Sequence, residues 1–575
     1  MNDLVLEIRN LSIDFRDENG YSTAVKNVSF NLQAGSVLGI VGESGSGKSV
    51  TSLSIMGLIP SPPGRIVSGE ILYRRENTLP TNLRKLPEKE LRKYRGKDIS
   101  MIFQEPMTSL NPVITCGRQV MEAILEHNDI GRREARSFVM DLFREVQLPR
   151  PESIFKSYPH QLSGGQKQRV MIAMAISCHP RILIADEPTT ALDVTVQRRI
   201  LDLLKSLQEK YRMSMIFISH DLGVIAEIAD QVIVMKDGEK VESGEISRIF
   251  HHPEHPYTKG LLACRPRMDR NYKRLPTLAD FIMSQKKEDS FDYDKRFFRD
   301  AGELVHRRNV IYAEKPFLEV KNLKTWFPAR RDFFGRPRDF IRAVDGVSFG
   351  VYPSETLGLV GESGCGKTTL GRSILRLNEP TEGQVIYKGK DLITLSASEL
   401  RSLRREMQII FQDPYSSLNP RLPVGNAVSE PMKVFRICEN ERERKKQTME
   451  LFERVGLEAK YFDRYPHELS GGQRQRVCIA RALAVNPSFI VCDESVSALD
   501  VSVQAQILNL LNDLKKDFGF TYIFISHDLS VVRFMSDRMM VMHEGKIVEE
   551  GFAQEICDKP GTEYTKRLIG AIPKG

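Results

Sequence analysis

Eight residues near the N-terminus, Gly42 to Ser49, have the types and spacing of a loop that binds phosphate. They fit the pattern G-x-x-x-x-G-K-[ST] at every position. The glycines let the backbone curl so that successive N–H groups face one anion. Lys48 would reach the β- and γ-phosphates of a nucleotide, and the Ser49 hydroxyl would ligate Mg²⁺. The residues expected to bind ATP here are Gly42, Ser44, Gly45, Gly47, Lys48 and Ser49.

The segments on either side of this loop are suited to position it. Val37–Val41 is apolar and short enough for a buried strand, and Val50–Met56 can begin a helix. The glycines would then lie between a strand and a helix N-terminus, which adds partial positive charge. This context predicts nucleotide binding rather than a chance glycine-rich turn.

The loop occurs a second time, and other phrases repeat with it. The second loop contributes Gly361, Ser363, Gly364, Gly366, Lys367 and Thr368. The other repeated phrases are Phe103-Gln104-Glu105-Pro106 with Phe411-Gln412-Asp413-Pro414, Leu162-Ser163-Gly164-Gly165-Gln166 with Leu469-Ser470-Gly471-Gly472-Gln473, Asp186-Glu187 with Asp493-Glu494, and Ser219-His220-Asp221-Leu222 with Ser526-His527-Asp528-Leu529. The offsets 470 − 163, 494 − 187 and 527 − 220 are all 307. A repeat this long indicates two homologous domains rather than a solenoid.

Composition excludes several classes of protein. A chain of 575 residues exceeds a single core, so at least two domains are expected. No apolar run reaches the about 18 residues of a transmembrane helix, and the first residues lack the pattern of a secretory signal. The eight scattered cysteines include no C-x-x-C pair, which argues for a reducing compartment and against a zinc or iron–sulfur site. The net charge of +8 is modest and predicts a solvated, mildly basic surface; it leaves contact with nucleic acid or anionic lipid open, and no nucleic-acid partner is expected.

Residues 266–315 belong to neither repeat. This stretch carries mixed charge, as in Lys286-Lys287-Glu288-Asp289, and a few aromatic residues. We expect a partly disordered linker with one short helix near Asp300 to Arg308. A flexible chain of about 50 residues spans roughly 40 Å, which would allow the two domains to pair head to tail.

Taken together, the repeated motifs resemble the ATP-binding cassette (ABC) ATPases over nearly the whole chain outside the linker. The phrases around Gln104, the signature Leu-Ser-Gly-Gly-Gln and His-Pro-Tyr-Thr at His255–Thr258 look like the dipeptide/oligopeptide/nickel importer branch. Gln168–Ala175 differs from Gln475–Ala482, as a D-type half followed by an F-type half would.

The resemblance implies an α/β fold with two nucleotide-binding domains. Each would have a RecA-like core with a phosphate loop, an antiparallel β subdomain and a helical signature subdomain. The expected boundaries are 1–265 for the first domain with its C-terminal extension, 266–315 for the linker, and 316–575 for the second domain with its extension.

Acidic pairs follow buried strands in both halves. Arg181–Ala185 is apolar and leads to Asp186, so the carboxylate would lie at the edge of the sheet where α/β proteins bind ligands. Asp186 and Asp493 would hold Mg²⁺ together with Ser49 and Thr368. The next residues, Glu187 and Glu494, would orient and polarise the attacking water.

Histidine and glutamine complete each expected site. His220 and His527 end further β-like runs, where each can hydrogen-bond the γ-phosphate. The resemblance implies that Gln104 and Gln412 contact Mg²⁺ or the water, and that their loops contact a membrane partner. Neither half has lost its glutamate or altered its signature, so both sites are expected to hydrolyse ATP.

The signature residues explain why two domains are needed. Ser163 and Gly165, with Ser470 and Gly472 in the second half, lie where a helix begins, and such small residues can approach a phosphate closely. By resemblance, each signature meets the nucleotide held by the other domain. Lys48 would pair with Ser470, and Lys367 with Ser163. Ala191-Leu192-Asp193 and Ala498-Leu499-Asp500 match the family loop that crosses this interface.

Three further expectations concern two positions that differ from the family pattern and the residues that would stack on adenine. Ser495 stands where the first half has Pro188, which would alter the turn after Glu494. Cys264 stands alone where related importers often carry a cysteine-rich extension, so no iron–sulfur cluster is expected. Phe15 and Phe327 best fit the position that stacks on adenine, with Tyr21 and Phe340 as the alternatives.

The predicted function is the ATPase subunit of an importer for peptides or peptide-like solutes. Such a subunit would dock on two permease subunits at the cytoplasmic face of the inner membrane and depend on an extracytoplasmic solute-binding protein. The rival hypothesis is a tandem-cassette ATPase that acts on the ribosome. Its branch has a long, strongly basic helical hairpin as a linker, whereas 266–315 has mixed charge and no sustained heptads. Dipeptides, longer peptides, glutathione-like solutes, peptide antibiotics and metal complexes all remain open as cargo.

Overall fold

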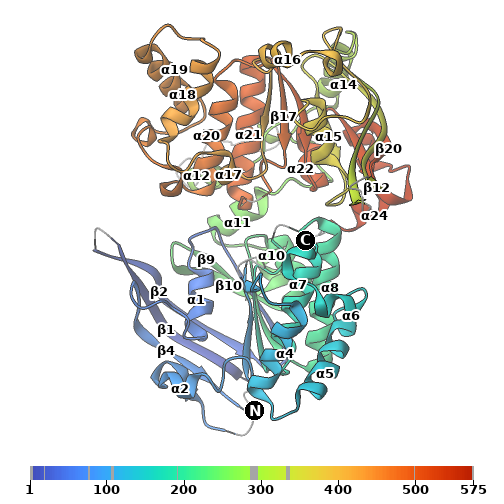
Figure 1. Cartoon of the computed structure of the whole chain (residues 1–575). Helices are drawn as coiled ribbons and strands as arrows, with labels where there is room; N and C mark the ends of the chain where they lie inside the picture. Colours follow the sequence, from blue (N-terminus) through green and yellow to red (C-terminus); the bar gives the residue numbers. More distant parts are fainter. Residues whose placement is uncertain are drawn as a thin grey trace. The chain divides into compact units, whose positions relative to one another are not determined.

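The computed structural model forms two compact units, the first ending at Leu262 and the second beginning at Ala263 (Figure 1). It describes residues 4–17, 20–75, 78–104, 109–190, 192–284, 296–331, 337–497 and 499–572. Some parts of the sequence motifs lie outside these residues, namely Glu105-Pro106, Ala191, Ala498 and the charged run 286–289.

The first unit is built on a sheet with the strand order β10-β9-β3-β8-β7-β6. Its strands are β3 (Val37–Val41), β6 (Ile99–Ile102), β7 (Ile182–Asp186), β8 (Ser214–Ser219), β9 (Gln231–Lys236) and β10 (Glu239–Glu245). All neighbours pair in parallel except β9 and β10. Because helices cover both faces of a parallel sheet, β3, β7 and β8 are buried along their whole length and are mostly apolar.

A separate antiparallel sheet and a group of helices complete the first unit (Figure 1). The antiparallel sheet has the order β2-β1-β4-β5 and comprises β1 (Leu4–Asp17), β2 (Gly20–Gln33), β4 (Gly64–Tyr73) and β5 (Thr81–Asn82). The helices are α1 (Lys48–Ile55), α2 (Glu88–Leu91), α4 (Cys116–His127), α5 (Arg132–Glu145), α6 (Pro151–Lys156), α7 (Gly164–Ile176), α8 (Val194–Tyr211), α9 (Leu222–Ile228), α10 (Ile246–His251) and α11 (Pro256–Ala263). Helices α4 to α7 pack on one another as a helical subdomain.

The second unit repeats this architecture, with the sheet orders β16-β17-β18-β13-β19-β20 and β12-β11-β14-β15. Its strands are β11 (Leu318–Arg331), β12 (Pro337–Val351), β13 (Thr356–Val360), β14 (Glu382–Tyr387), β15 (Lys390–Asp391), β16 (Met407–Ile410), β17 (Phe489–Asp493), β18 (Thr521–Ile525), β19 (Arg538–His543) and β20 (Lys546–Phe552). Its helices are α12 (Leu278–Ser284), α14 (Ala301–Ile311), α15 (Lys367–Ile374), α16 (Ala397–Leu403), α17 (Pro414–Ser417), α18 (Val424–Val434), α19 (Glu441–Arg454), α20 (Gly471–Leu483), α21 (Val501–Phe518), α22 (Leu529–Met535), α23 (Ala553–Asp558) and α24 (Glu563–Gly570). The expected α/β fold class, with its antiparallel and helical subdomains, is confirmed.

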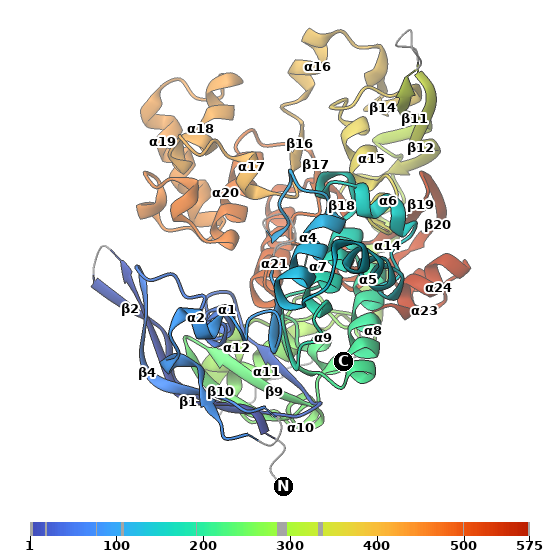
Figure 2. The same ribbon diagram turned by 60° about the horizontal axis from the view of Figure 1, so that its bottom comes forward.

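The described parts of the stretch read as a linker are packed on the second unit. The backbone N–H of Leu275 donates to Asn509 Oδ1 at 2.8 Å, and Asn509 returns a bond of 2.8 Å to the Leu275 carbonyl. The expected short helix is present as α14, which lies beside β19, β20 and α23 (Figure 2). Its Arg307 forms an ion pair with Asp537, just before β19. The charged residues in the described parts of 266–315 therefore include residues that pack on the second unit.

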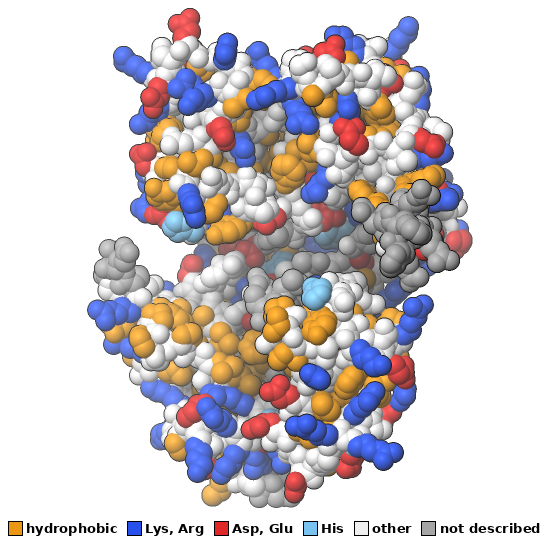
Figure 3. Space-filling model, in the orientation of Figure 1, with side chains coloured by type: hydrophobic (Ala, Val, Ile, Leu, Met, Phe, Trp, Pro, Cys, Tyr) orange, Lys and Arg blue, Asp and Glu red, His pale blue; other side chains and the backbone are white. Residues whose placement is uncertain are grey.

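The surface is mixed in charge. Lys and Arg side chains alternate with Asp and Glu side chains over the visible face of each unit (Figure 3), in keeping with the modest net charge of +8. Among the described residues, no helix is both long enough and apolar enough to cross a membrane.

Candidate functional site

The two phosphate loops connect a buried strand to a helix in both units, as the sequence predicted. In the first unit β3 ends at Val41 and α1 begins at Lys48. Gly47, the residue before α1, has φ 94°, and a Cβ atom there would lie 2.6 Å from the Ala24 carbonyl oxygen, so only glycine fits. Gly366 stands in the same place before α15, with φ 109°.

Each loop is wrapped around its lysine. Lys48 Nζ donates to the carbonyl oxygens of Gly42 at 2.7 Å and Glu43 at 2.8 Å. Lys367 Nζ donates to those of Gly361 at 2.8 Å and Glu362 at 3.0 Å. Both lysines are buried against the backbone of their loops. A phosphate in the cradle would meet a positive charge already in place.

The residues predicted to hold Mg²⁺ lie together in both units. Ser49 Oγ donates to Asp186 Oδ1 at 3.0 Å, and Thr368 Oγ1 donates to Asp493 Oδ1 at 2.8 Å. Both carboxylates end a central strand and are buried, and burial raises the pKa of Asp186 to about 6. Asp493 Oδ2 is buried without a hydrogen-bond partner. A hydroxyl beside a carboxylate with free acceptor capacity is an oxygen-donor set suited to Mg²⁺.

Glu187 is held by three side chains, two of which come from distant segments of the unit. Its Oε2 accepts from Gln104 Nε2 at 3.2 Å and from Thr190 Oγ1 at 2.9 Å, and it lies 3.3 Å from His220 Nδ1. Burial opposes ionisation of this carboxyl, but the bonds from His220 and Thr190 and the charge of Lys48 lower its pKa to about 2. An ionised carboxylate next to the expected metal ligand can polarise a water molecule.

The second unit holds Glu494 in a related but different way. Gln412 Nε2 donates to Glu494 Oε2 at 2.7 Å, and His527 Nδ1 lies 3.6 Å from the same oxygen. Lys367 Nζ lies 3.7 Å from Oε1. Burial again opposes ionisation of Glu494, yet the charges and bonds of His527 and Lys367 lower its pKa.

The sequence comparison did not reveal one asymmetry between the two glutamates. Ser497 occupies the position of Thr190, but its hydroxyl donates to the Glu494 backbone carbonyl at 2.9 Å instead of the carboxylate. The expected effect of Ser495 is not seen at the glutamate, because Glu494 and Glu187 share the same φ of 46°. The Ser495 hydroxyl is buried without a hydrogen-bond partner.

The signature serines cap the helices that follow them. The Ser163 side chain accepts from the Gln166 backbone at the start of α7, and Ser470 accepts from Gln473 at the start of α20. Gly165 and Gly472 lie in the first turns, where a Cβ would approach a valine at 2.8 Å and 2.5 Å. Both serines are exposed at the positive end of a helix, where an anion can be bound.

Two tyrosines that the sequence analysis did not assign hold the phosphate loops. The Tyr257 hydroxyl accepts from the backbone N–H of Glu43 at 3.1 Å, and the Tyr564 hydroxyl accepts from that of Glu362 at 3.2 Å. The repeat in the sequence could have identified these tyrosines, because 564 − 257 is again 307 and a threonine follows each tyrosine. Tyr257 is part of the His-Pro-Tyr-Thr phrase, which had served only to recognise the branch.

The adenine-stacking residues stay predictions. Phe15 is partly buried against the core of the first unit, whereas Phe327 is 40% exposed. Of the alternatives, Tyr21 lies under Arg65, whose Cζ is 3.6 Å from the ring centroid, and Phe340 is 48% exposed. The exposed rings of Tyr21, Phe327 and Phe340 are accessible to a base, but exposure alone does not identify the stacking residue.

Cys264 lies in the core of the second unit and is fully buried. Within the described ranges, no group of three or more His, Cys, Asp or Glu side chains is placed to hold a metal ion. The absence of an iron–sulfur cluster stays a prediction.

The comparisons with known proteins agree with this geometry. The family model "ABC transporter" matches residues 25–190 and 344–497, and the model "Oligopeptide/dipeptide transporter, C-terminal region" matches 241–291. The chain therefore belongs to the ABC transporter family as an ATPase with two cassettes. Within that family it falls in the peptide importer branch, and the ribosomal alternative is not supported.

Its relatives are similar over almost their whole length. The glutathione import ATP-binding protein GsiA of Pectobacterium atrosepticum is 48% identical over 99% of this chain and 89% of the relative. GsiA of Salmonella typhimurium shows the same identity and coverage. Among solved structures, the dimeric MJ0796 cassette bound to ADP and Pi is 31% identical over 41% of this chain and 98% of its own length, with a TM-score of 0.38.

Proposed function

We propose that this chain energises the import of a peptide-like solute of the size and chemistry of glutathione. The observation that carries the proposal is the presence of two complete sets of lysine, metal-binding acid, glutamate and histidine in one chain that is 48% identical to glutathione import ATP-binding proteins. Cargo binding itself would occur in a solute-binding protein and the permease, so this chain would supply the energy of the cycle.

The residues of each site have distinct roles in hydrolysis. Lys48 and Lys367 would bind the β- and γ-phosphates. Glu187 and Glu494, held ionised at neutral pH, would accept hydrogen bonds from the attacking water and draw its proton. Ser49 with Asp186, and Thr368 with Asp493, would hold Mg²⁺, which when bound neutralises charge on the phosphates.

Both cassettes would be needed for each hydrolysis event. Ser163 and Ser470 are exposed at the N-termini of α7 and α20. We infer that Ser470 meets the nucleotide on Lys48 and that Ser163 meets the nucleotide on Lys367. ATP would then bring the two units together, and loss of the γ-phosphate would separate them.

A groove on the second unit would receive the permease. It has a volume of about 320 Å³ and is lined by residues from β16, α18 and α20, among them Phe411, Val434 and Arg481. Val434 is 53% exposed at this groove. An amphipathic helix of a partner can bind in such a groove. Gln412 follows Phe411 and donates to Glu494 at 2.7 Å. Movement of a partner helix in the groove would therefore shift Gln412 and change its bond to the catalytic glutamate.

Co-purification tests this proposal directly. The chain would be tagged at its C-terminus, membranes extracted in mild detergent, and the bound proteins identified. Two multi-span proteins in stoichiometric amounts are expected, and Val434→Asp should reduce their recovery. Recovery with ribosomes and no membrane protein would overturn the proposal. Uptake of labelled glutathione in cells lacking this chain, with a dipeptide as the comparison, would then identify the cargo.

A further inference from the structure

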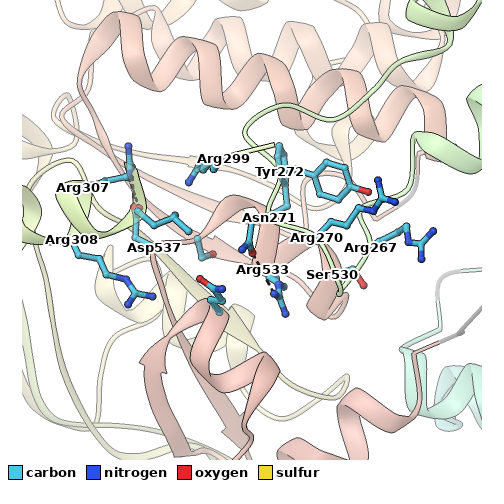
Figure 4. A pocket seen from close by; sticks show the side chains of 14 residues that line it. Arg267, Arg270, Asn271, Tyr272, Arg299, Arg307, Arg308, Ser530, Arg533 and Asp537 are labelled. Carbon is cyan, nitrogen blue, oxygen red and sulfur yellow. Dashed lines mark hydrogen bonds and ion pairs between the residues drawn. The ribbon is translucent and has the colours of Figure 1, made fainter. Parts of the chain in front are cut away.

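The second unit contains a cavity with a concentration of arginine side chains that the nucleotide site does not use. Residues from the stretch 266–315 and from α22 line it together, and its volume is about 50 Å³. Figure 4 shows Arg267 and Arg270 at one end, Arg307 and Arg308 at the other, and Arg299 and Arg533 between them.

Four of these arginines are neutralised by carboxylates. Arg307 pairs with Asp537 at 2.5 Å, and Arg308 pairs with Glu555 at 2.8 Å. Arg533 pairs with Asp558 at 2.7 Å, and Arg267 pairs with Asp269 at 2.9 Å. Asp537 is also shared with Lys515, whose Nζ lies 3.6 Å from Oδ2.

The other two arginines have no carboxylate partner. Among the described residues, neither Arg270 nor Arg299 forms an ion pair; Arg270 lies over the ring of Phe298, 5.1 Å from its centroid. Arg299 is half-buried, and its pKa is lowered by burial and by the neighbouring charge of Arg307. Asp537 and Glu303 lie close enough to oppose this lowering, but neither forms an ion pair with Arg299. A half-buried guanidinium without a paired carboxylate is stabilised when an anion binds to it.

Two buried polar atoms beside the cavity also lack partners. They are Arg533 Nε and Ser536 Oγ, and the Arg533 side chain is only 8% exposed. Buried donors of this kind are normally hydrogen-bonded, so their lack of a protein acceptor points to a ligand that supplies one.

The first unit has no counterpart of these groups. At the offset of 307, Arg533 corresponds to Ala226, because 533 − 226 = 307. By the same offset Ser536 corresponds to Ala229. The two unpaired polar atoms thus occur in the second unit alone.

From these observations we infer that the cavity binds a phosphate group. Its volume of about 50 Å³ exceeds the roughly 10–15 Å³ that one water needs and suits a tetrahedral oxyanion rather than a whole nucleotide. Guanidinium forks match phosphate oxygens with paired hydrogen bonds. Arg270 and Arg299 supply the donors, and the unpaired Arg533 Nε and Ser536 Oγ lie buried beside them. The phosphate is either free in solution or part of a lipid headgroup.

The test follows the unfolding of the second unit in the full chain. Trp326 is the single tryptophan of the chain and lies in β11, so its fluorescence reports on this unit. Saturating ADP occupies the phosphate loops, and ionic strength is held constant with chloride. Inorganic phosphate should raise the melting temperature by about 2–4 °C.

Arg270→Gln combined with Arg299→Gln should abolish this rise. The matched control is Arg401→Gln with Arg442→Gln, which removes the same charge from exposed positions in the same unit and should keep the rise. Should the double variant fail to fold, Arg270→Gln alone, at an exposed position, should raise the phosphate Kd at least threefold.

A second arm separates the two sources of phosphate. In flotation with phosphatidylglycerol vesicles, binding that is lost in the Arg270/Arg299 variant, without a response to inorganic phosphate, would assign the site to a lipid headgroup. Equal responses of the double variant and the unmodified chain to both probes, or no response of the unmodified chain to either, would overturn the proposal.

Discussion

The hydroxyl of Tyr257 accepts a hydrogen bond from the backbone N–H of Glu43 at 3.1 Å, joining helix α11 to the first phosphate loop. Tyr257 is only 1% exposed, so the bond is made out of contact with water. It satisfies a loop N–H and fixes the position of the residue after Gly42. The C-terminal extension of the cassette thereby becomes part of the phosphate site.

Replacing this tyrosine should therefore weaken nucleotide binding without removing any group that touches the nucleotide. Tyr257→Phe removes only the oxygen and leaves the Glu43 N–H without its partner, at a cost of about 1–3 kcal/mol. Because the loop must then be ordered by the ligand, we expect the ATP Kd of the first site to rise roughly 5-fold or more. Titration of a fluorescent ATP analogue would measure it.

The matched variant is Tyr564→Phe, which removes the equivalent bond to Glu362 in the second unit. It should weaken the second site by a similar factor. An unchanged affinity in both variants would show that the loops keep their shape without the tyrosines.

Thr190 gives the first glutamate a support that the second lacks. Thr190→Val removes the 2.9 Å bond to Glu187 Oε2 while keeping the side-chain shape. Hydrogen bonds to charged groups contribute about 1.5–3 kcal/mol, part of which Gln104 and His220 would retain. We expect a several-fold fall in the ATPase rate with little change in ATP affinity.

Ser497→Ala is the matched control for Thr190→Val. Its hydroxyl bonds the Glu494 backbone and not the carboxylate. The rate of phosphate release should therefore change less than in the threonine variant. If both variants lowered the rate equally, the difference between the two sites would have no catalytic consequence.

Both glutamates should be needed for full activity. Glu187→Gln and Glu494→Gln keep the side-chain size but remove the base. Since general-base catalysis contributes about 10²–10⁴-fold, the double variant should lose at least about 100-fold of its phosphate release rate. Each single variant should lose half or more. An unchanged rate in Glu187→Gln would contradict the proposal that the first site hydrolyses ATP.

The motifs could be predicted from the sequence because each depends on local chemistry. The loop around Lys48 and the strand that ends in Asp186 are encoded by a few adjacent residues, and both lie where the spacing placed them. The contacts of Tyr257 and Thr190 depend instead on how distant segments meet. Tyr257 is 214 positions from Glu43, and no local pattern reports which atom its hydroxyl reaches.

The stretch 266–315 is a second case in which the sequence does not report a distant contact. Its charged composition suggested a loose linker because solvated charge and buried ion pairs look alike in a sequence. Arg307 is one such charge, yet it pairs with Asp537, which is 8% exposed. Only the fold of the second unit supplies the partner that makes this arginine a packing residue.

That buried charge cluster leads to a prediction on pH. Lys515 is buried in α21, where its Nζ donates to Thr356 Oγ1 at 2.5 Å and lies 3.6 Å from Asp537 Oδ2. Burial lowers the pKa of Lys515 to about 8, and the charge of Arg307 adds to this, while Asp537 and Glu355 oppose it. The unfolded chain keeps a lysine pKa near 10.5. Between these values the unfolded state binds more protons, so the free energy of unfolding should rise with pH.

Lys515→Gln should remove this rise, which amounts to at most about 3 kcal/mol between pH 8 and 10.5. The substitution introduces the residue that the first unit carries at the equivalent position, Gln208, where 515 − 208 = 307. Lys516→Gln, an exposed neighbour on the same helix, should leave the rise intact. Urea unfolding followed by Trp326 fluorescence at pH 7.5, 9 and 10 would measure the slope. The same slope in both variants would mean that Lys515 does not lose its proton in the folded unit.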